Sequence, residues 1–210
     1  MFYRNKILVT CLLLVLLGFI SFLVLQRNQS QITSCSDCFV ATTKENRLVQ
    51  IYQDPVLNFS IRYPADYRID TSYNYQGLGP GKEIKGVKFL IPISLATGTN
   101  LSSYDTGVSV ETIPLVEKCE ASLFLPGEIS AQDIVEHGVT YSFAQVQEGA
   151  AGNRYEEQVW ALKDSSPCFA VRYFIHSTVV ENYPEGTIIE FDKTSLINTF
   201  DQIRSSLNTL

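Results

Sequence analysis

The sequence predicts an α+β domain, a mostly antiparallel β-sheet flanked by helices, preceded by one N-terminal transmembrane helix. Three observations support this: a long uncharged run near the amino terminus, recurring segments rich in β-branched and aromatic residues, and an amphipathic pattern at the carboxyl end. They divide the chain into a cytoplasmic N-terminus (1–6), a transmembrane signal-anchor (7–25), a linker (26–46) and an extracytoplasmic globular domain (47–210).

Residues 7–25 contain no charged side chain. At about 1.5 Å per residue, a helix of this length matches a hydrocarbon layer of roughly 30 Å. Arg4 and Lys6 precede the run and Arg27 alone follows closely, so we expect a single-pass protein of the cell membrane with its amino end in the cytoplasm and the domain outside. A cleaved signal peptide is the alternative, but its apolar region would be shorter and would end in small residues.

The chain beyond residue 30 is acidic, with 13 Lys and Arg against 22 Asp and Glu. Nucleic-acid phosphates and anionic lipid headgroups both require a basic face. We therefore exclude nucleic acid as a partner and expect an envelope protein or a small ligand, besides the membrane that the span crosses. No cofactor is expected.

Seven segments are expected as strands, because Val, Ile, Tyr and Phe favour extended backbone and turn residues separate the segments. They are residues 47–53, 57–63, 86–92, 107–113, 138–147, 153–163 and 168–177. In the last of these, the alternation puts Val171 and Tyr173 on one face and Arg172 and His176 on the other. Both faces of this strand are therefore expected to be partly covered.

Helical patterns are fewer. Leu196, Phe200 and Ile203 recur at helical spacing after Asp192, whose side-chain oxygen can cap the first turn. A shorter helix is expected around residues 130–136, and His137 would then lie at its carboxyl end.

The stretch NFSIRYPADYRI, residues 58–69, resembles the opening segment of PsbP/Mog1-like domains: an alternating apolar strand, a Tyr-Pro turn and an aromatic residue before the next strand. The closing helix, with Thr199, Phe200 and Ile203, resembles theirs. The resemblance covers about residues 57–210 and implies an antiparallel sheet sandwiched by helices, in a family that acts mostly as binding or assembly modules. It transfers no catalytic motif, and Tyr67 stands where many relatives have Trp.

Four of the five cysteines follow the span. In an oxidising compartment they support up to two disulfides, and three pairings are possible. The preferred pairing joins Cys35 to Cys38 and Cys119 to Cys168, the second closing a loop of about 50 residues that contributes about 3 to 4 kcal/mol. Cys35 and Cys38 also define the alternative function, an exported thiol-disulfide redox protein, although the polar linker and Asp37 are poor surroundings for a reactive thiol.

Five side chains near turns or strand ends are candidate ligand contacts, because aromatic rings suit sugars or peptides. They are Tyr73, Tyr75, Tyr104, Tyr155 and His176. The Gly-rich stretch at residues 77–82 lacks the spacing of a phosphate-binding loop. Glu156 and Glu157 are adjacent in a strand, so they should point to opposite faces and not form a carboxylate pair.

These observations favour a membrane-tethered extracytoplasmic binding or assembly module that is not an enzyme, with no catalytic residue and no metal ligand assigned. A hydrolase that uses His137 or His176 stays an open alternative, because a histidine near a nucleophile and an acid can activate a hydroxyl.

Overall fold

The computed structural model of the chain describes residues 48–209. The predicted span and linker lie outside these residues, together with Cys35 and Cys38, so the proposed domain boundaries stay predictions. Within residues 48–209, no helix combines the length and the apolar character that a membrane crossing requires.

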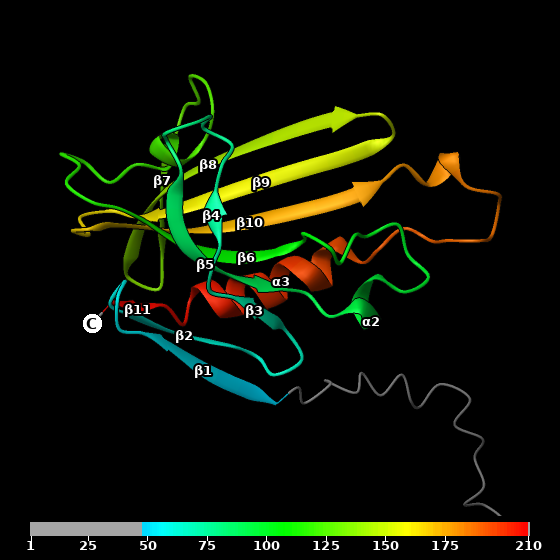
Figure 1. Cartoon of the computed structure of the whole chain (residues 1–210), viewed down its shortest axis with the longest axis horizontal. Coiled ribbons are helices and arrows are strands. Elements are labelled where there is room, and N and C mark those ends of the chain that lie inside the picture. The colour runs from blue at the N-terminus through cyan, green and yellow to red at the C-terminus, as the bar shows by residue number, and fades with distance from the viewer. Residues whose placement is uncertain (1–47, 210) are drawn as a thin grey trace, which may run out of the picture. The chain divides into compact units, whose positions relative to one another are not determined.

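The described residues form two antiparallel sheets (Figure 1). The smaller sheet has the order β1-β2-β11, with β1 (Val49–Asp54), β2 (Phe59–Pro64) and β11 (Asn208–Thr209). The larger sheet consists, in spatial order, of β3 (Arg68–Asp70), β5 (Ile84–Leu90), β6 (Gly107–Ile113), β10 (Cys168–Thr178), β9 (Asn153–Leu162), β8 (Val139–Ala150) and β7 (Gln132–Glu136), with β4 (Asn74–Tyr75) paired to β5. The mostly antiparallel sheet that the sequence predicts is confirmed.

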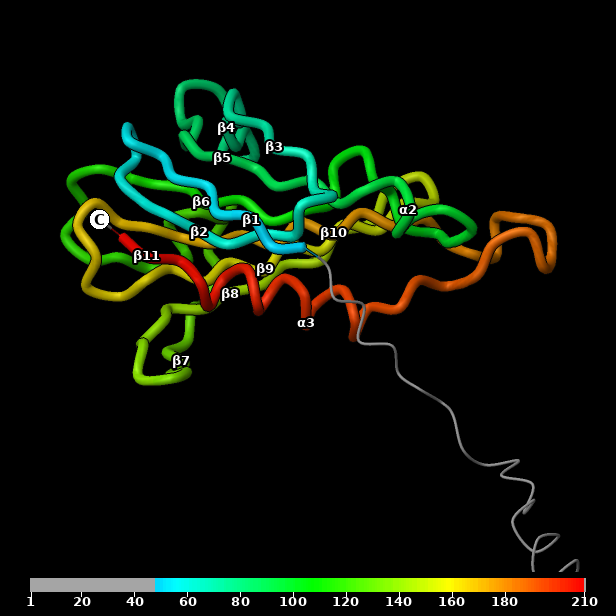
Figure 2. Tube along the Cα trace, turned by 90° about the horizontal axis from the view of Figure 1, so that it is seen from below, coloured from blue at the N-terminus to red at the C-terminus, as the bar shows by residue number. Residues whose placement is uncertain are grey.

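Helices are few in this part of the chain: α2 (Ile93–Ala96), α3 (Lys193–Arg204) and the 3₁₀ turns η1 (Ala121–Phe124) and η2 (Val180–Asn182). Helix α3 runs along one face of the larger sheet, beside the smaller sheet (Figures 1 and 2). It begins where the sequence predicts, because Asp192 accepts a hydrogen bond from the Ser195 N–H at 3.0 Å and so satisfies a free donor of the first turn.

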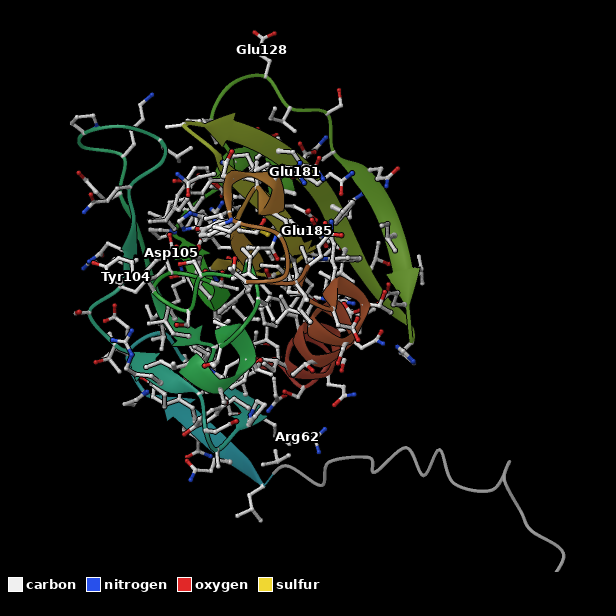
Figure 3. The ribbon with its side chains drawn as sticks, turned by 90° about the vertical axis from the view of Figure 1, so that its right-hand side faces the viewer. Arg62, Tyr104, Asp105, Glu128, Glu181 and Glu185 are labelled. Carbon is white, nitrogen blue, oxygen red and sulfur yellow. A yellow bond between two sulfur atoms is a disulfide. The ribbon has the colours of Figure 1, made fainter. Side chains whose placement is uncertain are left out.

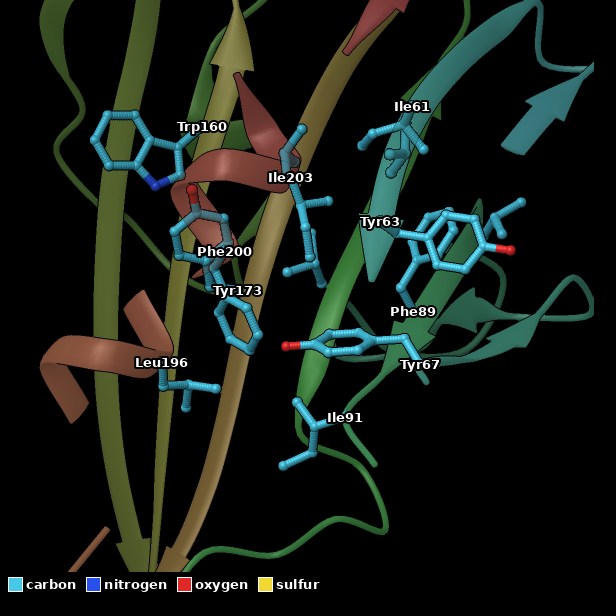
Figure 4. Close-up of a cluster of buried hydrophobic side chains, with 14 of the residues drawn as sticks. Ile61, Tyr63, Tyr67, Phe89, Ile91, Trp160, Tyr173, Leu196, Phe200 and Ile203 are labelled. Atoms are coloured by element: carbon cyan, nitrogen blue, oxygen red, sulfur yellow. The ribbon is translucent and has the colours of Figure 1, made fainter. Parts of the chain in front are cut away.

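The main core lies between α3, the smaller sheet and what we call the inner face of the larger sheet (Figure 4). Leu196, Phe200 and Ile203 of α3 are buried in it, as their spacing predicts. Arg204 ends the helix and fastens it: its guanidinium lies 4.0 Å from the Trp160 ring, and its Nε donates to the Tyr173 hydroxyl at 2.8 Å.

The opposite, outer face of the larger sheet is covered by loops, not by helices. Residues 71–83 and 114–131, the latter including η1, pack there in a second cluster of buried apolar side chains. The disulfide between Cys119 and Cys168, with 5.1 Å between the Cα atoms, fastens the second loop to the start of β10. This predicted pairing is confirmed, and both faces of β10 are covered as its alternation indicates.

The helix expected around residues 130–136 is wrong. Residues 132–136 are strand β7, which pairs antiparallel with β8 from Gln132 opposite Phe143 to Glu136 opposite Val139. His137 and Gly138, with φ of 51° and 81°, form the tight turn between them, and a two-residue hairpin turn of this kind requires positive φ at both positions. His137 is therefore a turn residue and does not end a helix.

Candidate functional site

Polar and aromatic side chains gather on the outer face of the larger sheet because every second residue of its strands points there. On β10 these are Arg172, Phe174 and His176, and on β9 they include Glu157 and Tyr155. Tyr155 is directly opposite His176, and Glu157 is opposite Phe174. These two neighbouring strands thus present a row of polar and aromatic groups on one surface.

Arg172 is the centre of this row and is fully buried. Its Nε and Nη2 donate to the two carboxylate oxygens of Glu111 at 2.8 Å each, Nη1 pairs with Glu157, and Nη2 also donates to the Phe124 carbonyl at 2.6 Å. Tyr75 stacks over the guanidinium, 3.4 Å from ring centre to carbon. Burial alone would lower the pKa of Arg172, but the charge and hydrogen bonds of Glu111 together with the charge of Glu157 outweigh it and raise that pKa.

Lys88 extends the row onto β5 and is only 8% exposed. Its Nζ lies 4.6 Å from the Phe174 ring centre and 5.3 Å from that of Tyr73, so aromatic faces replace much of its water. Within the described part of the chain no carboxylate lies within ion-pair distance of this ammonium. Burial lowers the pKa of Lys88 to about 8, and the charge of Asp105 opposes that shift.

His176 closes the row at the far end of β10. Its Nδ1 lies 2.8 Å and 2.9 Å from the two oxygens of Asp105, and its Nε2 lies 3.0 Å from Oδ1 of Asn153. Tyr155 packs against the imidazole with 4.5 Å between ring centres. Both ring nitrogens thus face oxygens of side chains that hold the ring in place, and neither faces a hydroxyl or thiol. This arrangement does not suit nucleophilic catalysis.

The structure brings four of the five candidate contacts to the outer face: Tyr75 stacks on Arg172, Tyr73 donates to Glu111, and Tyr155 packs on His176. Most of the aromatic surface of these side chains contacts other residues of the domain. Tyr104 does not join them, because its side chain is 85% exposed on the loop before β6. Glu156 and Glu157 point to opposite faces as the alternation requires, Glu157 toward Arg172 and Glu156 toward Lys193.

A groove of about 410 Å³ opens beside this cluster, on the inner face at the same end of the larger sheet. Ile175 and Phe191 line it with apolar surface. Glu190 adds a carboxylate and Arg154 a guanidinium, and neither group makes an ion pair with any described residue. Glu148 also borders the groove, but it lies opposite Tyr155 on the outer-face side of β8. The remaining lining residues are Gln147, Tyr155, Glu156, Ser177 and Lys193. The groove therefore combines an apolar surface with uncompensated charge.

The end of the domain that carries this groove is acidic. It consists of residues 99–106, 147–156 and 176–193. Bridges from Thr99 to Ile189 and from Leu101 to Ser177 join the first segment to the third, and strand pairing joins the second to the third. These segments contain seven Asp and Glu but only two Lys and Arg. Figure 3 looks onto this end and shows Glu181 and Glu185 projecting beyond the strands. Such a concentration of negative charge attracts cationic ligands.

Sequence reasoning missed the groove and most of the polar row. Phe191 and Glu190 lie in an irregular loop, and contacts with residues 99–101, including a hydrogen bond from the Phe191 N–H to Asn100, bring them to the ends of β9 and β10. The sequence did contain a signal for Arg172, because an arginine inside an otherwise apolar strand implies a buried carboxylate partner. Its partner Glu111 lies 61 residues away in sequence, so no local pattern could identify it.

The fold and the groove define an α+β domain with a mostly antiparallel sheet and a ligand-sized groove at one sheet end. The chain matches no family model and no curated protein. Among solved structures it is similar to cyanobacterial PsbP (CyanoP) from Synechocystis, with 16% identity and a TM-score of 0.43, over 85% of this chain and 99% of that one.

It is also similar to the Saccharomyces cerevisiae Ran-binding protein Mog1p, with 9% identity and a TM-score of 0.45, over 78% of this chain and 96% of that one. A protein from Bacteroides thetaiotaomicron gives 12% identity and a TM-score of 0.41, over 77% of this chain and 48% of that one. The predicted resemblance to PsbP/Mog1-like domains is thus confirmed as a weak similarity of fold. A likeness at this level says nothing about function.

Proposed function

We propose that this protein is a membrane-tethered, non-catalytic binding module whose groove holds a basic peptide segment of an envelope partner. The observation that carries the proposal is the groove itself, in which the unpaired carboxylate of Glu190 stands beside the apolar side chains of Ile175 and Phe191. A peptide that carries Lys or Arg can place its charge on this carboxylate and its aliphatic stem on the apolar surface.

The lining favours binding over chemistry. It contains neither histidine nor cysteine, and Glu156 is already paired with Lys193. Arg154, which has no ion-pair partner among the described residues, can donate to peptide carbonyl oxygens. The surrounding acidic end would accelerate the approach of a cationic segment, because its field extends about 8 Å at physiological ionic strength.

The tether is the second part of the proposal and rests on the apolar run at residues 7–25. A domain held to the membrane by a 21-residue linker samples a restricted volume, so its effective concentration toward an envelope partner is high. A weak contact in the groove would then be occupied. This matters because a small polar groove supplies limited affinity by itself.

The test is a titration of the full chain in detergent with a fluorescent decapeptide of alternating Lys and Leu, against the matching Glu and Leu peptide. We expect binding of the basic peptide only, weakening as salt increases. Glu190→Gln should reduce the affinity by up to about 5-fold, the upper end of the range for one exposed charge pair.

The matched control is Glu128→Gln, which removes one exposed carboxylate on the loop before β7 and should leave the affinity unchanged. Equal binding of both peptides, or a Glu190→Gln variant that binds like the unmodified chain, would refute the assignment of the groove.

A further inference from the structure

Strand β1 exposes an unusual amount of apolar surface for an edge strand. Four large apolar side chains within nine residues are exposed: Leu48 by 79%, Val49 by 63%, Ile51 by 67% and Val56 by 87%. Val49 and Ile51 point away from the core because their neighbours, Tyr52 among them, point into it. Isolated surface apolar residues need no explanation, but a contiguous strip indicates a contact surface.

The backbone of β1 is also open on one side. Among the described residues β1 pairs only with β2. The carbonyl oxygens of Leu48 and Asp54 accept hydrogen bonds from the β2 side, from Ala65 and Asn58, at 2.8 Å each. Since bonding direction alternates along an antiparallel strand, the even-numbered residues bond to β2 and the odd-numbered ones face outward. Three residues therefore present free N–H and C=O groups: Val49, Ile51 and Gln53.

The strand lacks the features that normally keep an edge unpaired, such as a lysine, a proline or a bulge. Its sequence is VQIYQD, and Asp54 is its one charged residue. Asp54 is buried and accepts hydrogen bonds from the N–H groups of Val56 and Leu57. Its carboxylate therefore stabilises the turn to β2 and does not keep another strand from pairing with the edge. The free edge is uncharged.

We propose that β1 pairs antiparallel with β1 of a second copy of this chain. In the register that sets Ile51 opposite Ile51, Val49 of each strand lies opposite Gln53 of the other. The three outward residues of each strand then exchange all their N–H and C=O groups, and the two small sheets merge into one. Neighbouring registers leave one of the three outward residues of each strand without a β1 partner.

A second copy fits this edge better than an unrelated strand because the register is self-complementary: a two-fold axis through Ile51 pairs Ile51 with itself, and each Val49–Gln53 pair is repeated on the other side. No like charges meet across the interface, and a β-branched pair stands at its centre. Confinement of two copies to one membrane would add to their pairing. The groove at the acidic end takes no part, so this dimer and the proposed binding function can be tested separately.

The first test is the mass of the full chain in detergent, by light scattering with correction for the micelle. We expect a dimer, and a monomer for Ile51→Lys, since two lysines would meet on the two-fold axis. Val135→Lys is the matched control: Val135 is 68% exposed on β7, an edge strand of the other sheet, and its variant should stay dimeric.

The second test does not depend on the Ile51→Lys variant folding. In a chain with Cys11, Cys35 and Cys38 replaced by Ser, Ile51→Cys should form a covalent dimer with a short bismaleimide, and Val135→Cys should not. A monomeric unmodified chain, a dimer that persists in a folded Ile51→Lys variant, or an Ile51→Cys that attaches to a different protein would each overturn the proposal.

Discussion

Arg172 bonds to two neighbouring strands and to the loop that covers the outer face of the larger sheet. A buried guanidinium is tolerable only when its donors are bonded and its charge is compensated. Glu111 supplies a bidentate acceptor, Glu157 a second charge, and Phe124 a carbonyl oxygen. Because Phe124 belongs to the covering loop, the arginine also holds that cover on the sheet. The network is therefore structural, and removal of one partner would leave an uncompensated buried charge.

Lys88 yields a prediction for the dependence of stability on pH. Its pKa is about 8 in the folded state, against 10.5 for an ordinary lysine, so the unfolded state binds more protons between these values. The free energy of unfolding should therefore rise with pH between about 8 and 10, by at most about 3 kcal/mol for a shift of this size. Above pH 10 tyrosines reverse the trend, since burial raises the pKa of Tyr52 to about 12.

The measurement is urea unfolding of the unmodified chain and of Lys88→Met at several pH values from 7 to 10. The difference in stability between the two should shrink as the pH rises, because the unmodified chain loses the penalty of a buried ammonium. Lys85→Met serves as the control on the same strand, since Lys85 is exposed. A pH profile of Lys88→Met parallel to that of the unmodified chain would show that Lys88 is not the group responsible.

At the scale of elements, tight turns determine which residues pair. β7, β8 and β9 follow one another through two-residue turns, His137–Gly138 and Ala151–Gly152, and all four residues have positive φ. Such turns match the twist of the strands that they join. At Gly152 a side chain would also collide, because a Cβ would lie 2.4 Å from Nδ2 of Asn182. The Ala151–Gly152 turn places the adjoining ends of β8 and β9 beside the groove.

Helix α3 should depend on its cap. Asp192→Ala removes the acceptor for the Ser195 N–H and should lower the free energy of unfolding by about 1 kcal/mol. Asp192→Asn keeps an oxygen acceptor and should lower it by much less. Thermal and urea unfolding of the three proteins provide the comparison. Equal losses for the two variants would mean that the charge of Asp192, and not its hydrogen bond, stabilises the helix.

At the scale of the whole domain, the larger sheet is buried on both faces by different means. Helix α3 and the smaller sheet cover the inner face, while two irregular loops cover the outer face. Irregular loops are stabilised weakly by their own backbone. The Cys119–Cys168 disulfide and the bond from Arg172 to Phe124 fasten one of these loops to β10. The outer cover therefore depends on covalent and ionic attachment.

Loss of this disulfide should destabilise the entire domain. Replacing Cys119 and Cys168 together by Ala should lower the free energy of unfolding by about 3 to 4 kcal/mol, because the closed loop restricts the unfolded chain. The unmodified protein after reduction should show a similarly lowered melting temperature. A melting temperature that does not change once reduction is verified by alkylation would show that the bond contributes little.

The sequence alone predicted much of this architecture. All seven expected strands are present, and the alternation along residues 168–177 correctly assigned both faces. The spacing of Leu196, Phe200 and Ile203 placed the closing helix on the core. Periodicity succeeded there because burial of one face is a local pattern. The error at residues 130–136 arose because pairing with β8 determined their conformation, and that pairing depends on a turn outside the segment.

Only the tertiary structure decided where function can reside. Glu111 and Arg172 meet across 61 residues, Asp105 and His176 across 71, and the groove joins a β-hairpin tip to the loop before α3. Such contacts depend on strand order and register, which no local propensity specifies. Composition and apolar periodicity predicted the class of domain, and the cysteines left three pairings, among which the structure shows the preferred Cys119–Cys168. The surfaces available for binding follow from long-range pairing, because only pairing brings distant side chains within bonding distance.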